Sequence, residues 1–300
     1  MLPYKKNYNF YSPLRYPGGK NTLFPFVSDL IRKNNFTNSI YSEPYAGGCG
    51  LALKLLFDEV INEIYLNDFD YFIYSFWTTI LHQSEEFCDW IYEVNVDIEK
   101  WFYYKHLLLY PTQSTKFEIA KATFFLNRCN ISGIIKGGVI GGKQQNGKYK
   151  IDARFNKTKL IEKIKLIASK KDVIHFTNLD ALDFLITLKD IESVFIYLDP
   201  PYFKKGSELY LNFYKESNHK DLFNFLVSYK KDFILSYDNI DFIKQLYKDF
   251  SIYRFNVSQS TSNKVGNEVI IFSDGLDFKK SLPKLKSPIK ITKGNITVPT

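Results

Sequence analysis

The sequence has few of the features that mark secreted, membrane-bound or metal-binding proteins. It contains three isolated cysteines, Cys49, Cys88 and Cys129, and four histidines, with no spacing typical of a zinc site. An odd, small number of cysteines predicts a disulfide-free protein of a reducing compartment. The longest apolar runs, such as Val194 to Leu198, are far shorter than the roughly 20 residues of a membrane span, and the first ten residues lack the apolar stretch of a signal peptide. We therefore expect a cytoplasmic protein with no metal and no membrane partner.

Positive charge is concentrated in one part of the chain. The net charge is +8, but the segment from Lys136 to Lys171 holds eleven Lys/Arg against two acidic residues, which leaves the other 264 residues near −1. Six more lysines and no acid follow from Lys279 onward. A basic segment on a near-neutral body is typical of nucleic-acid binding, although a solvated basic helix face is the alternative.

Short runs of β-branched or aromatic residues alternate with helical patterns at both ends of the chain. Seven runs have strand length, at 38–43, 63–67, 173–177, 193–198, 232–236, 252–257 and 268–273. Helical patterns lie between them at 51–60, 179–188, 219–230 and 241–248. This alternation predicts an α/β fold with a seven-stranded doubly wound sheet and helices on both faces.

The middle of the chain breaks this alternation. It holds three tryptophans, a helical run at 116–128, a glycine-rich basic loop at 133–154 and an amphipathic run at 160–167. We expect residues 71–170 to form an inserted, mostly helical subdomain, and residues 1–70 and 171–278 to form the surrounding domain. Residues 279–300 are a basic C-terminal tail, for which a disordered segment, a DNA contact and an extra strand all stay open.

The sharpest local motif is Asp199-Pro200-Pro201-Tyr202, at the end of a predicted strand. Groups beyond the carboxyl end of a strand face the ligand crevice of an open α/β sheet. Each proline stiffens the turn and has no amide hydrogen to donate. A carboxylate beside a rigid carbonyl can accept both hydrogens of an NH₂ group, and Tyr202 offers a flat face to a planar base. An ordinary Asp-Pro turn is the alternative.

A second motif is the segment 43–50, Glu-Pro-Tyr-Ala-Gly-Gly-Cys-Gly, between a strand and a helix. Its glycines permit a tight turn and close approach to a ligand at a helix N-terminus, and Asp68, about twenty residues later, could hold a ribose hydroxyl. A helix-capping turn is the alternative. Ahead of it, Lys20 follows a Tyr-Pro-Gly-Gly turn, and Asp180 follows another strand, where helix capping is as good an interpretation.

Together these motifs resemble the Dam-like (alpha-group) DNA adenine-N6 methyltransferases that use S-adenosylmethionine. The Gly-Gly-Lys turn, the glycine loop, a helical insertion and the Asp-Pro-Pro-Tyr motif follow in the family's order, up to about Asp274. Segments 125–128, 150–156 and 236–239 also resemble a subgroup of these enzymes. The resemblance implies a Rossmann-like class I methyltransferase fold with an inserted target-recognition subdomain. One departure is Cys49, which replaces the last glycine of the family's aromatic-x-Gly-x-Gly loop.

The resemblance also implies roles for individual residues. Asp199 and the Pro200 carbonyl would accept the amino hydrogens of a flipped adenine, and Tyr202 would stack on it. Lys20 would lie near the methionine carboxylate, Asp68 at the ribose and Asp180 at the cofactor's adenine. The residues expected around the cofactor are Tyr16, Gly19, Lys20, Glu43, Tyr45, Gly47, Gly48, Asp68, Asp180 and Asp199; those expected at the target base are Asp199, Pro200, Pro201 and Tyr202.

The basic insertion is expected to bind double-stranded DNA. Side chains assigned to phosphates and groove entry are Lys136, Lys143, Lys148, Lys150 and Arg154. Asn127 is placed with the DNA-binding residues, and Arg128 and the amides Gln144, Gln145 and Asn146 are candidates for base edges.

Other functions stay open at this point. The same site chemistry suits N4-methylation of cytosine or methylation of adenine in RNA, and a catalytically silent DNA-binding module could keep this fold. A Rossmann oxidoreductase is disfavoured because a full dinucleotide motif is missing. We expect a nucleoid-associated enzyme of a prokaryote or phage, and its partner could be a cognate restriction endonuclease, although an orphan enzyme fits equally well.

Overall fold

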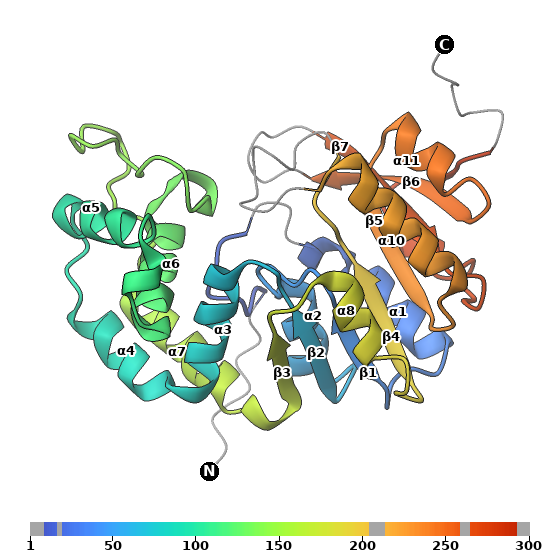
Figure 1. Ribbon diagram of the computed structural model, residues 1–300, viewed down its shortest axis with the longest axis horizontal. Helices are drawn as coiled ribbons and strands as arrows, with labels where there is room; N and C mark the ends of the chain where they lie inside the picture. Colours follow the sequence, from blue (N-terminus) through green and yellow to red (C-terminus); the bar gives the residue numbers. More distant parts are fainter. Residues whose placement is uncertain (1–8, 17–19, 204–213, 259–264, 293–300) are drawn as a thin grey trace.

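The computed structural model describes residues 9–16, 20–203, 214–258 and 265–292. Within these ranges eight strands form one sheet in the order β3-β2-β1-β4-β5-β7-β6-β8 (Figure 1). The strands are β1 (Ile40–Glu43), β2 (Glu63–Asn67), β3 (Ile174–Thr177), β4 (Val194–Leu198), β5 (Phe233–Asp238), β6 (Ser251–Ser258), β7 (Val265–Phe272) and β8 (Ile289–Lys290). β1 to β5 pair in parallel, whereas β7, β6 and β8 join by antiparallel pairing. The order 3-2-1-4-5 is that of a doubly wound sheet.

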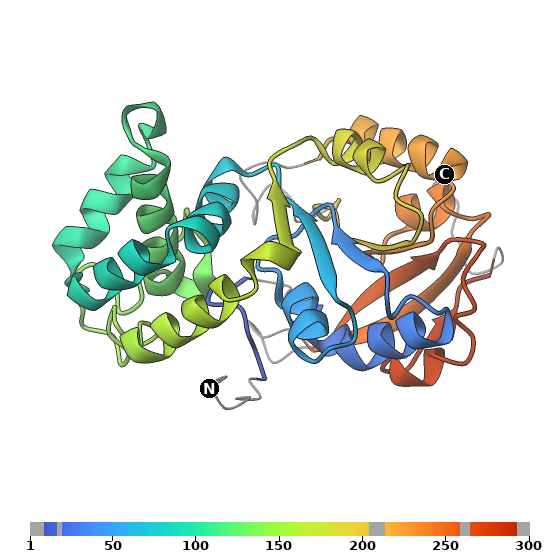
Figure 2. The same cartoon turned by 90° about the horizontal axis from the view of Figure 1, so that it is seen from below.

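Helices cover both faces of this sheet (Figure 2). One face carries α1 (Phe24–Lys33) and α2 (Gly50–Phe57), and the other carries α8 (Ala181–Thr187), α10 (Glu216–Ser228) and α11 (Asp241–Leu246). Every side chain of β4 is buried, as expected of a central parallel strand. Alternate β4 residues pack into different cores: Phe195 and Tyr197 join the core under α1 and α2, and Ile196 the core under α8 and α10. The predicted α/β architecture is confirmed.

The predicted count of seven strands is wrong by one within the described residues. The two residues of β8 pair with Tyr253 and Arg254 of β6. Thus part of the basic tail is an extra strand, one of the three interpretations that the sequence left open. A two-residue edge strand carries too few alternating side chains to produce a recognisable period, so its pattern could not be read from the sequence.

The segment between β2 and β3 is helical and lies beside the β3 edge (Figures 1 and 2). Its helices are α3 (Tyr71–His82), α4 (Ser84–Glu93), α5 (Ile98–Leu107), α6 (Lys116–Cys129) and α7 (Lys157–Ala168). The start of α6 is fixed by a capping box, in which Thr115 and Glu118 bond each other's backbone amides. Short 3-10 turns occur at Lys20–Leu23, Pro111–Gln113, Ile131–Gly133, Lys171–Val173 and Leu282–Lys284.

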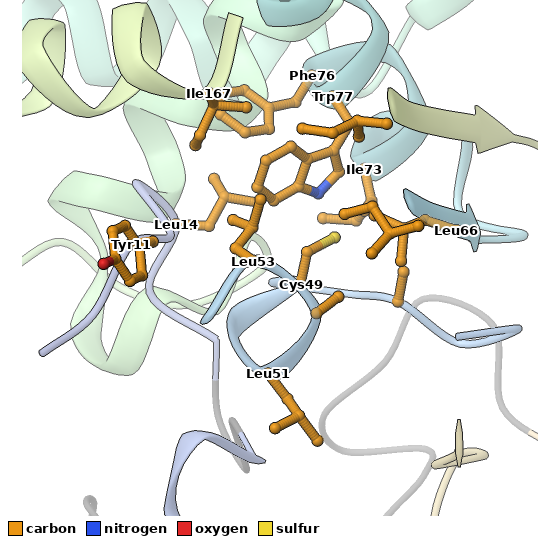
Figure 3. Close-up of a cluster of buried hydrophobic side chains, with 14 of the residues drawn as sticks. Tyr11, Leu14, Cys49, Leu51, Leu53, Leu66, Ile73, Phe76, Trp77 and Ile167 are labelled. Atoms are coloured by element: carbon orange, nitrogen blue, oxygen red, sulfur yellow. The ribbon is translucent and has the colours of Figure 1, made fainter. Parts of the chain in front are cut away.

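Helix α3 joins the insertion to the sheet. Phe76 stacks on Phe124 of α6 with ring centroids 5.4 Å apart, and Trp77 stacks on Phe176 of β3 at 6.1 Å. Figure 3 shows Trp77 beside Cys49 of the glycine loop, within a buried cluster that also includes Leu53 of α2. The hydrophobic core is therefore continuous across the predicted boundary near residue 71. No helix in the described ranges is long and apolar enough to span a bilayer.

Candidate active site

A cavity of about 510 Å³ lies where the loops after β1, β2, β3 and β4 meet. β1 and β4 are neighbours, and the chain winds in opposite directions on either side of them, so this is the switch point at which doubly wound sheets bind ligands. Most of the predicted site residues line the cavity: Tyr16, Lys20, Glu43, Tyr45, Gly48, Asp68, Asp180, Asp199 and Pro201. Gly19 lies outside the described residues.

Asn67, at the end of β2, holds three of these loops together. Its Nδ2 donates to the carbonyls of Pro44 at 3.1 Å and Leu179 at 3.0 Å. Its Oδ1 accepts from the Thr177 hydroxyl and the Leu179 amide, each at 2.8 Å. The side chain is buried, and its amide thereby replaces water for four polar groups. Sequence reasoning missed Asn67, because nothing in a strand-end Asn-Asp pair reveals four long-range partners.

The glycine loop wraps around the ring of Tyr16. Gly47 has φ +48°, its amide donates to Oδ2 of Asp68 at 2.8 Å, and its carbonyl accepts from Nε1 of Trp77 at 2.9 Å. A Cβ atom on Gly47 would lie 2.7 Å from ring carbons of Tyr16, and one on Gly48 would lie 2.7 Å from Tyr16 Cβ. Both glycines are therefore needed for close approach, and Tyr16 forms the wall that the resemblance implied.

Cys49, the departure from the family's glycine pattern, has a left-handed backbone with φ 51° and ψ 25°. A non-glycine residue there costs about 1–2 kcal/mol. Its side chain is buried, and its thiol donates weakly to the Gly47 carbonyl at 3.7 Å. The loop thus keeps a path suited to glycine, while the cysteine side chain fills space against Trp77 (Figure 3).

Three acids on the cavity wall have defined partners. Asp68 accepts from the Gly47 amide and, at 2.9 Å, from the Asp70 amide, while burial raises its pKa to about 7. Glu43 accepts from the Tyr41 hydroxyl at 2.9 Å, and burial raises its pKa to about 8. Asp180 caps α8 by accepting from the Leu182 amide at 2.9 Å, so its capping role and its place in the cavity coexist.

Lys20 is buried and its ammonium contacts three groups of the protein itself. Nζ donates to the Tyr202 hydroxyl at 2.6 Å and to the two oxygens of Glu268 at 3.0 and 3.2 Å, and lies 3.3 Å from Oδ1 of Asp199. Burial lowers the pKa of Lys20, but Asp199, Tyr202 and Glu268 outweigh it and raise the pKa well above its usual value. The geometry thus assigns Lys20 to these side chains in place of the methionine carboxylate that the resemblance implied.

The two oxygens of Asp199 have different surroundings. Oδ1 accepts from the Ser236 hydroxyl at 2.7 Å and pairs with Lys20, and Ser236 itself bonds the Tyr197 hydroxyl at 2.8 Å. Among the described residues, no hydrogen bond reaches Oδ2. Burial raises the pKa of Asp199 to about 6, with Glu268 adding to the shift and Lys20 opposing it. The carboxylate therefore keeps one oxygen available for a donor.

The remaining residues of the Asp-Pro-Pro-Tyr motif are placed less simply. Pro201 lines the cavity, whereas Pro200 is buried and neither it nor Tyr202 is among the lining residues. The Tyr202 hydroxyl accepts from Lys20 and donates to Glu268 in a short bond. The stacking of Tyr202 on a base stays a prediction, and its hydroxyl has a structural anchor that the sequence did not reveal.

Two of the predicted DNA contacts in α6 are replaced by structural roles. Asn127 is only 1% exposed, and its amide bonds the backbone N–H and C=O of Arg15 at 2.8 and 2.7 Å and the Gly133 carbonyl at 2.9 Å. Arg128 donates to the carbonyls of Arg154 and Pro13. Burial, with the nearby guanidinium of Arg15, lowers the pKa of Arg128 to about 10. The expectation that Asn127 binds DNA is wrong, since α6 turns it inward.

Gln145 is also turned toward the protein. Its Nε2 donates to the carbonyls of Ile140 and Gly142, and its Oε1 accepts from the Ile151 amide at 2.8 Å. These bonds fix the shape of the glycine-rich loop and leave the Gln145 amide no free donor for a base edge, so that prediction is corrected as well. The exposed side chains of this loop are those of the predicted phosphate contacts and two amides, namely Lys136, Lys143, Lys148, Lys150, Arg154, Gln144 and Asn146.

Three site residues escaped sequence analysis besides Asn67. Glu268 was taken only as the start of a strand, although a lone acid before the apolar run 269–272 is a signal of a buried charged role. Phe69 is 59% exposed and lines the cavity directly after Asp68. Asn21 lines the cavity beside Lys20, and its Oδ1 is buried without a hydrogen-bond partner.

The fold and the site define a class of protein: an α/β enzyme with a ligand cavity at the switch point and an Asp-Pro-Pro-Tyr motif beside it. A comparison with protein families identifies the class further. Residues 16–261 match the model of the D12 class N6 adenine-specific DNA methyltransferases. The chain belongs to this family, so it is a DNA adenine methyltransferase that uses S-adenosylmethionine as methyl donor.

The cavity fits this cofactor. Its volume lies within the range of small-molecule sites. Its lining carries five carboxyl groups (Glu43, Asp68, Asp70, Asp180 and Asp199) against two lysines (Lys20 and Lys215), an excess of acid that suits a cationic ligand. The unpartnered Oδ1 of Asn21 is an acceptor, as an amino group requires, and Phe69 offers an exposed ring to a flat one.

Proposed function

We propose that this enzyme transfers the methyl group to N6 of an adenine that is flipped out of double-stranded DNA at a specific sequence, with Asp199 as the catalytic residue. The observation that carries the proposal is the asymmetry of the Asp199 carboxylate. Ser236 and Lys20 occupy Oδ1, whereas Oδ2 accepts no hydrogen bond from the described residues. An amino group that donates to Oδ2 would therefore complete the site without displacing a protein contact.

The chemistry follows from what an acceptor does to an amino nitrogen. The N6 lone pair of adenine is delocalised into the ring, so it is a poor nucleophile. A carboxylate that accepts an N6 hydrogen favours the pyramidal nitrogen with its lone pair exposed, and it stabilises the positive charge that develops there. The Pro200 carbonyl is the proposed acceptor of the second hydrogen. S-adenosylmethionine, when bound, supplies an electrophilic methyl group on a positively charged sulfur.

Residues around the cavity would orient the two substrates. Asp68 keeps oxygen lone pairs for ribose hydroxyls after accepting two backbone amides, and Asn21 would accept from the amino group of the methionine part. Tyr16 and Tyr45 would form the wall beside it. Holding the reacting atoms close and aligned supplies most of the acceleration that such a site can give without a covalent intermediate.

The basic insertion would hold the DNA. Its exposed side chains (Lys136, Lys143, Lys148, Lys150 and Arg154) suit phosphates, while Gln144 and Asn146 remain the exposed candidates for base edges. Extracting an adenine from the stack costs a few kcal/mol, which phosphate contacts and the base pocket must recover. The proposal extends to the setting: nucleoid DNA of a prokaryote or phage, with a cognate restriction endonuclease as partner. Resistance of in vivo methylated DNA to such a nuclease tests that part.

The decisive experiment transfers a labelled methyl group from S-adenosylmethionine to unmethylated duplex DNA and identifies the product nucleoside by mass spectrometry. We expect N6-methyladenine from the wild type and at least a 10²-fold lower rate from Asp199→Ala, on the order expected for loss of a preorganised charge. Asp183→Ala is the matched control, because Asp183 is exposed in α8 and lies outside the cavity lining. N4-methylcytosine as product, or full activity of Asp199→Ala, would overturn the proposal.

A further inference from the structure

Glu268 sits among the groups of the methyl-transfer site although it comes from an antiparallel strand. β7 runs opposite to β5, and Glu268 pairs in register with Asp238, the last residue of β5. The first half of β7 therefore lies at the edge of the sheet where the parallel strands end, which is the edge that carries Asp199. The side chain is buried, so its charge needs partners within the protein.

Those partners form a closed set of hydrogen bonds. Lys20 donates to both carboxylate oxygens of Glu268, at 3.0 and 3.2 Å, and to the Tyr202 hydroxyl at 2.6 Å. The Tyr202 hydroxyl in turn donates to Oε1 of Glu268. Each group thus fixes the other two. Lys20 lies closer to Glu268 than to Asp199, from which it is 3.3 Å away.

The charges explain what this set achieves. One ammonium stands between two carboxylates, so Glu268 holds the cation back from Asp199. Without Glu268, Lys20 would have Asp199 as its one remaining carboxylate in this cluster and would move toward it, since a buried ammonium is strongly drawn to an opposite charge. That shift would occupy the Asp199 carboxylate and release the Tyr202 hydroxyl.

We propose that Glu268 is a positioning residue for methyl transfer, which anchors Lys20 and Tyr202 and thereby keeps the Asp199 carboxylate available to the target amino group. This inference rests on the proposed function, because it takes Asp199 as the acceptor. Glu268 contacts neither proposed substrate in this arrangement. Its effect is exerted through Lys20 and Tyr202.

The test is Glu268→Gln, which keeps the shape of the side chain and removes its charge. We expect kcat to fall on the order of 10²-fold, as small misplacements of reacting groups do, with little change in the Kd for S-adenosylmethionine. The acid limb of the kcat/KM profile should move to lower pH, because the charge of Glu268 contributes to the raised pKa of Asp199. Glu268→Asp, which restores the charge on a shorter stem, should recover part of kcat and return the acid limb toward that of the wild type.

Two controls separate this role from simple loss of structure. Glu63→Gln makes the same change at a half-buried carboxylate of β2 that pairs with His175, and it should leave kcat and the pH profile unaltered. A ¹³C NMR titration of aspartate carboxyls, with the Asp199 signal assigned by its loss in Asp199→Asn, reports the Asp199 pKa without any turnover. In Glu268→Gln that pKa should fall below the wild-type value.

The outcomes distinguish the two proposals. Wild-type kcat and an unshifted Asp199 titration in folded Glu268→Gln would overturn the role of Glu268, while methylation that depends on Asp199 would still stand. Wild-type protein that binds cofactor and DNA yet methylates no adenine would instead refute the proposed function. A Tyr202→Phe/Glu268→Gln double variant whose loss equals the sum of the single losses would also contradict the inference, because groups in one bonded set should be non-additive.

Discussion

Replacing Gly47 by alanine tests how the glycine loop shapes the cofactor cavity. The backbone of Gly47 has φ +48°, and an added Cβ would lie 2.7 Å from two ring carbons of Tyr16. The left-handed conformation costs an alanine about 1–2 kcal/mol. Since carbon atoms pack best at about 3.5–4.0 Å, the Tyr16 ring must also shift by about 1 Å. Tyr16 lines the cavity, so we expect this movement to take cofactor space.

Two other glycines separate these effects. Gly142 has φ +74° and open space around the added Cβ, so Gly142→Ala introduces backbone strain alone. Gly48 has no such strain, but its added Cβ would lie 2.7 Å from Tyr16 Cβ, so Gly48→Ala introduces the contact alone. All three substitutions add one methyl group.

Urea denaturation and calorimetric titration with S-adenosylmethionine measure the two consequences. Gly142→Ala should lower the free energy of unfolding by about 1 kcal/mol and leave the cofactor Kd unchanged. Gly48→Ala and Gly47→Ala should raise the Kd about tenfold, which corresponds to 1.4 kcal/mol, and Gly47→Ala should also be destabilised. An unchanged Kd for Gly47→Ala, or an equal rise for Gly142→Ala, would refute the assignment of Tyr16 to the cavity wall.

Four further outcomes follow from the same geometry. Activity should fall as pH drops through about 6, because Asp199 must be ionised to accept a hydrogen bond and its raised pKa is about 6; a kcat/KM profile that stays flat from pH 7 to 5 would contradict this. Cofactor binding at pH 7 should release protons, since a cation lowers the pKa values of Asp68, about 7, and Glu43, about 8, and calorimetry in buffers of different ionisation enthalpy would detect it. Asn127→Ala should lower the free energy of unfolding by about 2–4 kcal/mol, because three buried hydrogen bonds are lost, with DNA sequence preference unchanged in the folded protein. Replacing Lys143 and Lys148 by glutamine should reduce the salt dependence of DNA binding by about one unit of slope per phosphate contact, whereas Lys189→Gln, exposed in the turn between α8 and β4, should not.

The sequence predicts the sheet well where strands are buried. Predicted limits for the strands that became β2 and β4 agree with the structure to within one residue, because continuous apolar runs bounded by polar residues are a strong signal. β8 escaped prediction because its two side chains are exposed and its pairing with β6 comes from distant parts of the chain. The residues that line the cavity were mostly found, since strand ends at a switch point share one edge.

Partners within the site could not be read in the same way. Lys20 and Glu268 are 248 positions apart, and their contact depends on the antiparallel entry of β7 into the sheet. Likewise Asn127 and Arg128 are adjacent in sequence, but successive residues of a helix point about 100° apart. Only the packing of α6 reveals that Asn127 faces the N-terminal segment. Motifs therefore locate a site, and long-range contacts decide what each side chain does there.

The distribution of charge joins these two levels. The cavity needs an excess of acid to favour a cationic cofactor and the positive charge that develops on N6, yet an acidic cavity repels DNA. The chain separates the two requirements: its carboxyl groups gather at the ends of β1 to β4, whereas the exposed lysines of the loop 133–154 belong to the helical insertion beside the β3 edge. Repulsion between the cavity and phosphates is screened within about 10 Å at 0.1 M salt. We infer that DNA is held by the insertion and that only the extracted base, which is uncharged, enters the acidic cavity.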